Sequence, residues 1–351
     1  MLTFFTTPRP FRGRDAILQR NALTSWLRLH PDVQILLFGD APGSMEFAWE
    51  LGLHFEPQAK PCDNAGAPRV AHQFSASPDA ELRARCATAA ASPREARALR
   101  VPAGARATAG PRGATEALQL HEMFGKARQL ARHRLLCYID SRMLLLPDFS
   151  EAFNRVEALY PEFLMVGRRW DVDISQPVGF AEQDWQDEVR HQALATGKCH
   201  AARQIDYLMF SHGLFPRDLP PLPLGSGLWN HWLIWRAVAD GSMVVDVSDV
   251  VLAIHQNHEA DAREISPKMQ GKELGDHVAL CGGSGHLCGI DRAPYRLTAK
   301  DVVPNRFRRL RNWCRSQNRL GREAAMLRRQ NEGKGARVKE LSAGQPLLQP
   351  R

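Results

Sequence analysis

Residues 135–142 read LLCYIDSR, an unbroken apolar run that stops at a single carboxylate, Asp140. A continuous apolar run of this length is typical of a central strand in a parallel sheet, because both faces of such a strand are buried. Ligands of open α/β sheets bind at the carboxyl ends of these strands. We therefore expect Asp140 at a ligand site. The simpler alternative is an aspartate that only caps the turn after a strand.

The first 55 residues alternate strand and helix patterns. Residues 2–6 and 33–38 are apolar runs typical of strands, whereas residues 15–29 repeat apolar side chains at helical spacing. Ser44 is expected to cap the next short helix. This β-α-β-α order predicts an α/β fold in which helices flank a mostly parallel sheet.

Residues 61–113 interrupt this pattern. Seventeen of the fifty residues in 65–114 are alanine, and most of the others are Arg, Pro, Gly or Ser. Such a segment buries too little apolar surface to offset the entropy that ordering would cost. We therefore predict a single domain formed by residues 1–60 and 114–300, with a disordered insertion and a partly helical basic tail at 301–351.

The positive charge of the chain is concentrated in the tail. The formal net charge is +8, and residues 304–351 hold 13 Lys and Arg against 3 Asp and Glu. Outside the tail and the insertion acidic residues predominate, so no specific nucleic-acid partner is expected. Phe307, Leu310, Trp313 and Leu320 fall near helical spacing among arginines. This pattern fits a helix on an anionic membrane surface or, alternatively, a solvated basic tail.

The composition excludes several classes of protein. No apolar run approaches the roughly 20 residues that cross a bilayer. The first eight residues lack the basic region and the longer apolar stretch of a secretory signal. The seven cysteines form no CxxC pair, which argues against a disulfide framework or a zinc ribbon. We expect a cytoplasmic protein, with the tail allowing peripheral contact with the inner face of the membrane.

Four segments carry a resemblance to one family. They are residues 25–40, 136–146, 163–171 and 206–258. In this order they resemble nucleotide-diphospho-sugar transferases of the GT-A type, close to a group of bacterial and plant glycosyltransferase-like proteins. The resemblance implies a Rossmann-like GT-A fold and transfer of a hexose from a nucleotide-sugar donor to a glycan or lipid-linked acceptor.

The resemblance also implies an Asp-x-Asp motif that holds ribose and a divalent cation, Mn²⁺ or Mg²⁺. Here the motif is degenerate, because the triplet is Asp140-Ser141-Arg142 and a guanidinium carries only donors. Either Arg142 itself holds the diphosphate, or the site binds without turnover. His255 and His258 follow the last predicted strand and would complete a metal shell with Asp140. A satisfied structural histidine is the alternative for both.

The remaining donor contacts implied by the resemblance lie at strand ends. The candidate donor-binding residues are Thr6, Asp40, Asp140, Arg142, Arg168 and Asp171. For Asp40, a simple turn aspartate is the alternative. Asp171 and Asp206 are strand-edge carboxylates that could face either the donor sugar or the acceptor.

On the acceptor side, related sequences show Trp-Asp-Asn-Trp where this chain has Trp229-Asn230-His231-Trp232. The aspartate would be a natural general base for an inverting transfer, and asparagine cannot take that role. His231 could, but on a helix it points about 100° away from its neighbour. Alternatively, the tryptophans face the core of an ordinary amphipathic helix. The candidate catalytic residues are Asp206, Asn230 and His231.

Two functions remain open at this point. One is a glycosyltransferase, and the other is a catalytically degenerate relative that serves as a nucleotide-sugar or glycan binding module. The missing acidic residues at positions 142 and 230 favour the binding module, whereas Asp40, Asp140 and His255 favour the enzyme.

Overall fold

The computed structural model describes most of the chain outside the alanine-rich insertion. The described residues are 1–57, 118–217, 219–224, 227–257 and 272–305, with positions 320, 323 and 326–328. The insertion predicted at 61–113, the candidate ligand His258 and most of the basic tail lie outside them. The described residues belong to one compact unit of the chain, which comprises residues 1–58 and 117–351.

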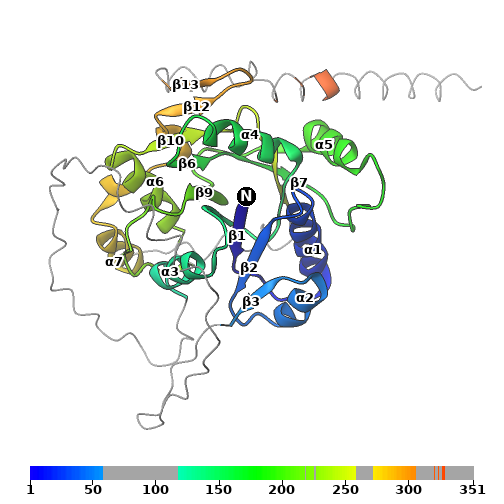
Figure 1. The fold of residues 1–351 in the computed structure, drawn as a ribbon, viewed down its shortest axis with the longest axis horizontal. Coiled ribbons are helices and arrows are strands. Elements are labelled where there is room, and N and C mark those ends of the chain that lie inside the picture. The colour runs from blue at the N-terminus through cyan, green and yellow to red at the C-terminus, as the bar shows by residue number, and fades with distance from the viewer. Residues whose placement is uncertain are drawn as a thin grey trace, which may run out of the picture. The chain divides into compact units, whose positions relative to one another are not determined.

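A nine-stranded sheet is the centre of the described part of the chain (Figure 1). Its strands are β1 (Leu2–Thr6), β2 (Gln34–Phe38), β3 (His54–Glu56), β4 (Leu135–Ile139), β6 (Phe163–Val166), β9 (Tyr207–Ser211), β10 (Met243–Asp246), β12 (Tyr295–Leu297) and β13 (Val302–Pro304). They lie in the order β13-β12-β10-β6-β9-β4-β1-β2-β3. β9 is antiparallel to β4 and β6, and β13 is antiparallel to β12, while the other neighbours are parallel. The predicted mostly parallel α/β sheet is confirmed.

A second sheet of four strands is present, which the sequence patterns do not predict. Its strands are β5 (Met143–Leu144), β7 (Arg169–Val172), β8 (Lys198–Cys199) and β11 (Ala253–Gln256), in the order β5-β11-β7-β8. β11 is parallel to β7 and antiparallel to β5, and β8 is antiparallel to β7. Strands of two to four residues are too short to show the alternation of apolar and polar residues that identifies a strand in a sequence.

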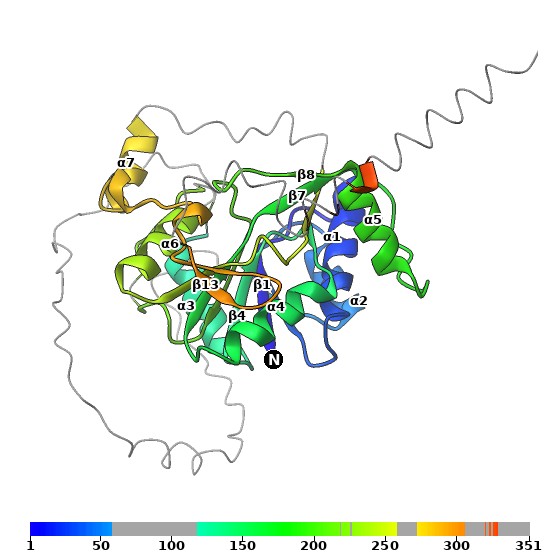
Figure 2. The same cartoon turned by 90° about the horizontal axis from the view of Figure 1, so that it is seen from above.

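Helices cover both faces of the main sheet (Figure 1). They are α1 (Gly13–Leu27), α2 (Ser44–Leu51), α3 (Leu120–Leu130), α4 (Pro147–Glu157), α5 (Trp185–Thr196), α6 (Trp229–Ala239) and α7 (Lys272–Leu280). The short 3₁₀ turns η3 (Ser284–His286) and η4 (Ile290–Arg292) follow α7. Helix α5 lies beside β7 and β8 of the second sheet (Figure 2). Pro147 begins α4, where its missing N–H has no helical partner to lose.

Alternate residues of the central strands face opposite helical layers. Phe4 of β1 packs with α1, α2 and α4, and its ring stacks on Trp26 with centroids 5.1 Å apart. Phe5 packs with α3 and α6, and its ring meets Phe124 edge-on at 5.0 Å. Because both faces are buried, the strands appear in the sequence as unbroken apolar runs, as residues 135–139 do.

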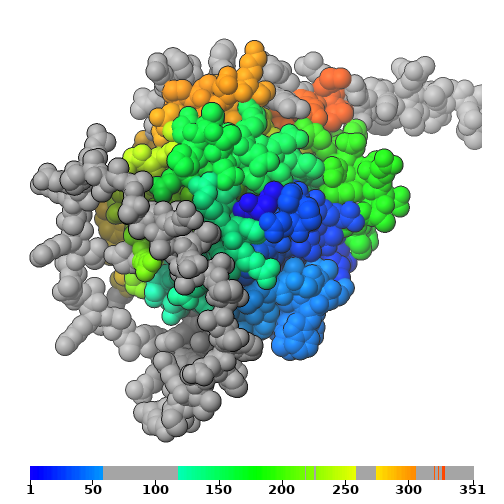
Figure 3. All heavy atoms as spheres, in the orientation of Figure 1, coloured from blue at the N-terminus to red at the C-terminus, as the bar shows by residue number. Residues whose placement is uncertain are grey.

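The β12–β13 hairpin lies at one edge of the main sheet. Arg155 of α4 donates to the carbonyl oxygens of Thr298 and Lys300, both at 2.9 Å. Figure 3 shows the hairpin in orange beside the green surface of α4. These hydrogen bonds fix the hairpin to the helical layer.

Two predicted boundaries differ from the structure. Gly43, with φ +85°, takes the N-cap position of α2, and Ser44 is the first helical residue. The strand predicted at 250–254 lies at Ala253–Gln256, so that His255 is inside the strand instead of after it. Pairing with β5 and β7 sets this register, and local propensity carries no information about it.

Part of the predicted basic tail packs on the protein. Leu320 is 1% exposed and joins the apolar cluster of α5 and the second sheet. Glu323 pairs with Arg190 of α5 at 2.9 Å, and Arg328 donates to the carbonyl of Ala195 at 3.2 Å. Leu320 therefore faces protein, whereas the other apolar residues of the predicted membrane-facing stripe lie outside the described residues. Within the described chain, no helix has the length and apolarity needed to cross a membrane.

Candidate functional site

The strand order of the main sheet reverses direction between β3 and β4. From β1 the chain proceeds through β2 to β3 and then returns to β4, on the other side of β1. In open α/β sheets, ligands bind outside the carboxyl ends of the strands at such a switch point. Thr6 ends β1 and Asp140 directly follows β4, so both residues lie at this edge.

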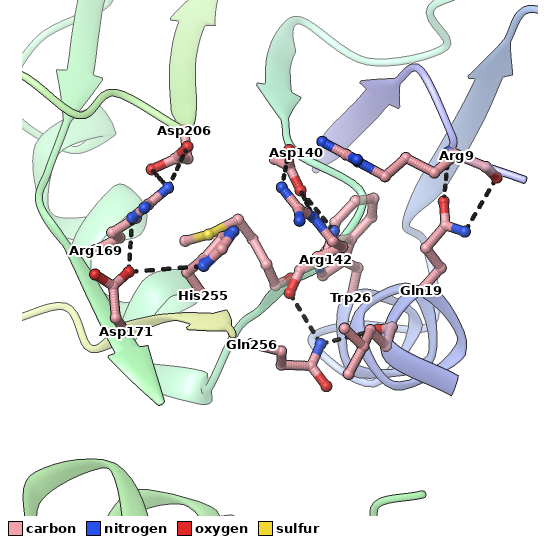
Figure 4. Close-up of polar contacts among 12 residues, drawn as sticks. Arg9, Gln19, Trp26, Asp140, Arg142, Arg169, Asp171, Asp206, His255 and Gln256 are labelled. Atoms are coloured by element: carbon pink, nitrogen blue, oxygen red, sulfur yellow. Dashed lines mark hydrogen bonds and ion pairs between the residues drawn. The ribbon is translucent and has the colours of Figure 1, made fainter. Parts of the chain in front are cut away.

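Asp140 is held by Arg142, two residues further along the chain (Figure 4). The backbone N–H and the Nε–H of Arg142 donate to Asp140 Oδ1 at 2.9 and 3.1 Å, and Nη2 donates to Oδ2 at 3.4 Å. Burial by itself raises the pKa of Asp140, but the charge and hydrogen bonds of Arg142 outweigh it and hold that pKa well below its usual range. Asp140 is therefore ionised at neutral pH, with a buried guanidinium as its counter-ion.

Arg169 of β7 joins two carboxylates that are far apart in the sequence. Its Nη1 lies 3.0 and 3.1 Å from the two carboxylate oxygens of Asp206, which precedes β9. Its Nε lies 2.8 Å from Oδ1 of Asp171, on the same strand. All three side chains are mostly buried. The guanidinium thus links the main sheet to the second sheet.

His255 lies between these two ion-paired groups (Figure 4). It is 1% exposed and pairs with Asp171 across β11 and β7, which places its Nδ1 3.6 Å from Asp171 Oδ1. Neither ring nitrogen has a hydrogen-bond partner among the described residues. Burial, followed by the charge of Arg169, lowers the pKa of His255 to about 4. The imidazole is therefore neutral at pH 7, with both nitrogens available to a ligand.

We call this set the strand-end cluster. It consists of Asp140, Arg142, Arg169, Asp171, Asp206 and His255. Buried polar atoms without partners are uncommon in proteins, and each one calls for an explanation such as a ligand. The unpartnered imidazole, the buried ion pairs around it and their place at the strand ends together make the strand-end cluster the candidate binding site.

Side chains of α1 and β11 hold the backbone beneath Arg142. Gln256 is fully buried, and its Nε2 donates to the carbonyls of Arg142 and Leu18 at 2.9 and 2.8 Å. Asn21 donates to Gln256 Oε1 at 2.9 Å, and Trp26 Nε1 donates to the Met143 carbonyl at 2.7 Å. These hydrogen bonds fix the backbone from which the Arg142 side chain extends. Such support keeps a binding group in position.

Two further arginines follow strands at this edge. Gln19 holds the backbone of Arg9, accepting its N–H at 2.8 Å and donating to its carbonyl at 3.1 Å. The Arg9 side chain extends toward Asp140 (Figure 4). Arg168 is 6% exposed, and its backbone N–H donates to Ser248 Oγ at 2.9 Å. An arginine therefore lies within three residues of the ends of β1, β4 and β6.

The turn after β6 requires glycine. A Cβ at Gly167 would lie 1.9 Å from the hydroxyl oxygen of Tyr207. Because Tyr207 is fully buried, it cannot move aside without disturbing the core. Gly167 therefore lets the chain pass Tyr207 and enter β7 with Arg169 facing Asp206.

The structure groups some of the predicted site residues and leaves others apart. Asp140, Arg142, Asp171, Asp206 and His255 all meet in the strand-end cluster. Thr6 is fully buried at the end of β1, and its hydroxyl has no hydrogen-bond partner among the described residues. Asp40 is exposed, beyond the end of β2.

Sequence reasoning missed Arg169 and Gln256. For Arg169 a signal exists, because it lies three residues after β6 and directly follows another arginine. For Gln256 none exists, because its hydrogen bonds reach residues more than 100 positions away.

Asn230 and His231, at the start of α6, form hydrogen bonds with backbone carbonyls of other segments. Asn230 Nδ2 donates to the carbonyl of Ile205 at 2.9 Å, and His231 Nδ1 lies 2.9 Å from the carbonyl of Cys288. Burial lowers the pKa of His231. Trp229 and Trp232 are buried against the core, so the alternative of core-facing tryptophans is confirmed.

The donor set of the strand-end cluster does not fit a divalent cation. In the part of the chain that the structure describes, no group of three or more His, Cys, Asp or Glu could hold a metal ion. Asp140 accepts three hydrogen bonds from Arg142, and Asp171 pairs with Arg169. A cation at either carboxylate would meet a guanidinium of the same sign at close range. No step of the chemistry is therefore assigned to a metal.

No family model and no curated protein matches the chain. Similar solved structures include S. aureus TarS residues 1–349 in complex with UDP-GlcNAc, with 9% identity, a TM-score of 0.38, and coverage of 80% of this chain and 64% of that chain. Another is glucosyl-3-phosphoglycerate synthase from Mycobacterium tuberculosis in complex with Mn²⁺, UDP and phosphoglyceric acid, with 10% identity, a TM-score of 0.38, and coverage of 81% of this chain and 79% of that chain. The chain thus spans less than two thirds of the TarS chain. Because these identities and TM-scores are low, the similar structures carry no functional argument. A functional assignment therefore rests on the strand-end cluster.

Proposed function

We propose that this protein binds a nucleotide-diphosphate sugar at the carboxyl ends of β1 and β4 and transfers the sugar to a hydroxyl of a glycan or a lipid-linked acceptor. The observation that carries the proposal is the strand-end cluster at the switch point of the sheet, with buried arginines and an unpartnered imidazole. The residues that carry the family resemblance, Asp140, Asp171, Asp206 and His255, are the ones that meet there.

The chemistry of the cluster suits a diphosphate leaving group. In the transfer, the bond from the anomeric carbon to the diphosphate breaks, a bond to the acceptor oxygen forms, and the hydroxyl proton passes to a base. Guanidinium groups bind phosphate oxygens through strong charge-assisted hydrogen bonds, and fixed cations stabilise the charge that develops on the leaving group. Arg142 and Arg169, with Arg9 nearby, would supply these cations.

Of the candidate catalytic residues, only Asp206 belongs to the cluster. Its carboxylate can accept a hydrogen bond from a sugar or acceptor hydroxyl, and Arg169 fixes its orientation. Asn230 and His231 support the fold locally, since their side chains bond to backbone carbonyls. Asp206 is therefore our candidate for orienting or deprotonating the acceptor.

One observation favours the binding-module alternative. Both oxygens of Asp206 already accept hydrogen bonds from Arg169, so an acceptor hydroxyl would have to compete with the guanidinium for them. A protein with this pairing could bind a nucleotide sugar and not turn it over.

A calorimetric titration with UDP-, GDP- and dTDP-sugars tests the proposal, followed by an assay for release of the nucleoside diphosphate. Binding together with release supports the transferase. Binding without release over a panel of glycan and lipid-linked acceptors supports the binding module. Absence of binding for every donor contradicts the transferase and a nucleotide-sugar binding module.

Asp206→Asn is the variant that separates the two roles. We expect it to bind the donor but release no nucleoside diphosphate, because the amide keeps the shape and loses the basic oxygen. Equal release rates in the variant and the wild type would exclude Asp206 as the base.

A further inference from the structure

We infer that the strand-end cluster binds a diphosphate through arginine side chains and without a divalent cation. The inference rests on the proposed function and adds the mode of recognition to it: Arg142 and Arg169 stand where a metal would otherwise neutralise the diphosphate.

The first observation is the position of Arg142. Its Nε and backbone N–H converge on one oxygen of Asp140 at 3.1 and 2.9 Å, while Nη2 approaches the other oxygen. A metal ion bound by Asp140 would need the same oxygens at about 2.0–2.2 Å, which the guanidinium already faces. The side chain at position 142 thus brings the positive charge that a metal would bring, and it is covalently part of the chain.

The second observation is the position of Arg169 on the other side of His255 (Figure 4). Its Nη1 donates to Asp206, while its Nε, 2.8 Å from Asp171 Oδ1, forms no hydrogen bond among the described residues. A guanidinium with five N–H donors can hold a carboxylate with one edge and a phosphate oxygen with another. The carboxylates therefore fix the plane of the guanidinium without using all of its donors.

The third observation is the unpartnered imidazole between the two arginines. His255 is 1% exposed, and neither of its nitrogens forms a hydrogen bond in the described part of the chain. A neutral imidazole has one N–H to donate. A phosphate oxygen placed between Arg142 and Arg169 would accept that N–H and satisfy a buried polar group. The three side chains together present several donors suited to an anion with several oxygens.

Titration of the wild-type protein in EDTA and again in Mn²⁺ tests the inference. The probes are inorganic pyrophosphate and the UDP-, GDP- and dTDP-sugars. We expect the same dissociation constant within about twofold in EDTA and in Mn²⁺. We expect Arg142→Gln and Arg169→Gln each to weaken binding about 10- to 100-fold, the usual effect of losing a charge-assisted hydrogen bond.

Arg190→Gln is the matched control. Arg190 also pairs with two carboxylates, Asp148 and Glu323, but away from the strand ends. We expect its affinity for each probe to equal that of the wild type. Equal weakening in Arg190→Gln and Arg142→Gln would show that the loss reflects general destabilisation, and it would overturn the inference.

The two hypotheses fail in different ways. Binding of a nucleotide sugar only in Mn²⁺ overturns the inference and leaves the proposed function intact. Binding of pyrophosphate in EDTA, with no nucleotide sugar bound more tightly, supports the inference and contradicts the proposed function. Absence of binding for every probe in both buffers overturns both.

Arg142→Asp gives a second readout that does not depend on activity. This variant recreates an acidic pair with Asp140, so we expect saturating Mn²⁺ to raise its melting temperature by about 5 °C, and that of the wild type not at all. If Mn²⁺ does not raise the melting temperature of the folded variant, the Arg142 side chain does not occupy the place of a metal ion. Should Arg142→Asp fail to fold, the Arg142→Gln titration still decides.

Discussion

Arg169 and Arg190 are each shared between two carboxylates, yet their surroundings differ. Around Arg190, Nε and Nη2 pair with Glu323 and Nη1 pairs with Asp148, so all three nitrogens have protein partners. Around Arg169, Nε forms no hydrogen bond among the described residues, and neither do the two ring nitrogens of the neighbouring His255. In the first arrangement every guanidinium nitrogen has a protein partner, and only Asp148 Oδ1 lacks one among the described residues. The second leaves buried polar groups for a ligand.

The Arg190 set ties three parts of the chain together. Asp148 lies in the first turn of α4, Arg190 lies in α5, and Glu323 belongs to the C-terminal segment. Leu320 fills the apolar cluster beside them. We therefore expect changes in the Arg190 set to alter the free energy of unfolding, and changes in the strand-end cluster to alter ligand affinity as well.

Asp140→Ala should have the largest effect on both the free energy of unfolding and the ligand affinity. It leaves the buried guanidinium of Arg142 without its counter-ion, which costs about 3–5 kcal/mol in the free energy of unfolding. We also expect it to abolish binding of UDP-, GDP- and dTDP-sugars, measured by calorimetry on protein whose folding has been checked by circular dichroism. In the Arg190 set, Glu323→Gln should lower stability and keep donor affinity. Unchanged affinity in Asp140→Ala would remove Asp140 from the site.

Leu320→Ala should lower the free energy of unfolding by about 3 kcal/mol, because it deletes a buried side chain and leaves a cavity. Urea denaturation measures this change. Donor affinity should stay the same, since Leu320 packs on α5 and the second sheet and has no contact with the cluster. A loss below about 0.5 kcal/mol would mean that this segment does not pack on α5 in solution.

His255 and Asp148 should make stability depend on pH with opposite signs. The pKa of His255 is lowered to about 4 in the folded protein, against about 6.5 in the unfolded chain. Its stabilising contribution is therefore complete above about pH 6.5 and is lost as the pH falls toward 4. Between pH 7 and 5 the wild type should lose about 2 kcal/mol relative to His255→Gln, measured by denaturation at each pH.

Asp148 provides the comparison from the Arg190 set. Burial raises its pKa to about 6, so the folded protein takes up this proton more readily than the unfolded chain. Over the same pH interval, acidification should therefore stabilise the wild type relative to Asp148→Asn, by about 1 kcal/mol. Parallel pH profiles for the wild type and both variants would contradict this view of the two groups.

Arg20→Gln should have the smallest effect. Arg20 pairs with Glu50 on the surface, where both side chains are about half exposed. Water and salt screen such a pair, so we expect a change below about 1 kcal/mol and no change in donor affinity. A change in donor affinity would show that surface charges near α1 contribute to the site.

The sequence by itself determines the central strands of the main sheet. Residues 135–139 and most positions of the other central strands are apolar because helices bury both of their faces, and this composition is readable without a structure. It also places Asp140 and Arg142 at a strand end, since both lie within three residues of β4. Local spacing is sufficient for these features because the residues that decide them are neighbours in the chain.

Only the tertiary structure decides how the site is assembled. His255 meets Asp171 because β11 pairs with β7, and Arg169 reaches Asp206 across 37 positions. The tertiary structure likewise turns Asn230 toward a backbone carbonyl. Strand register and ion pairs between distant residues depend on burial and on which surfaces meet. No local pattern records these, so the second sheet and the strand-end cluster emerge only when the chain is folded.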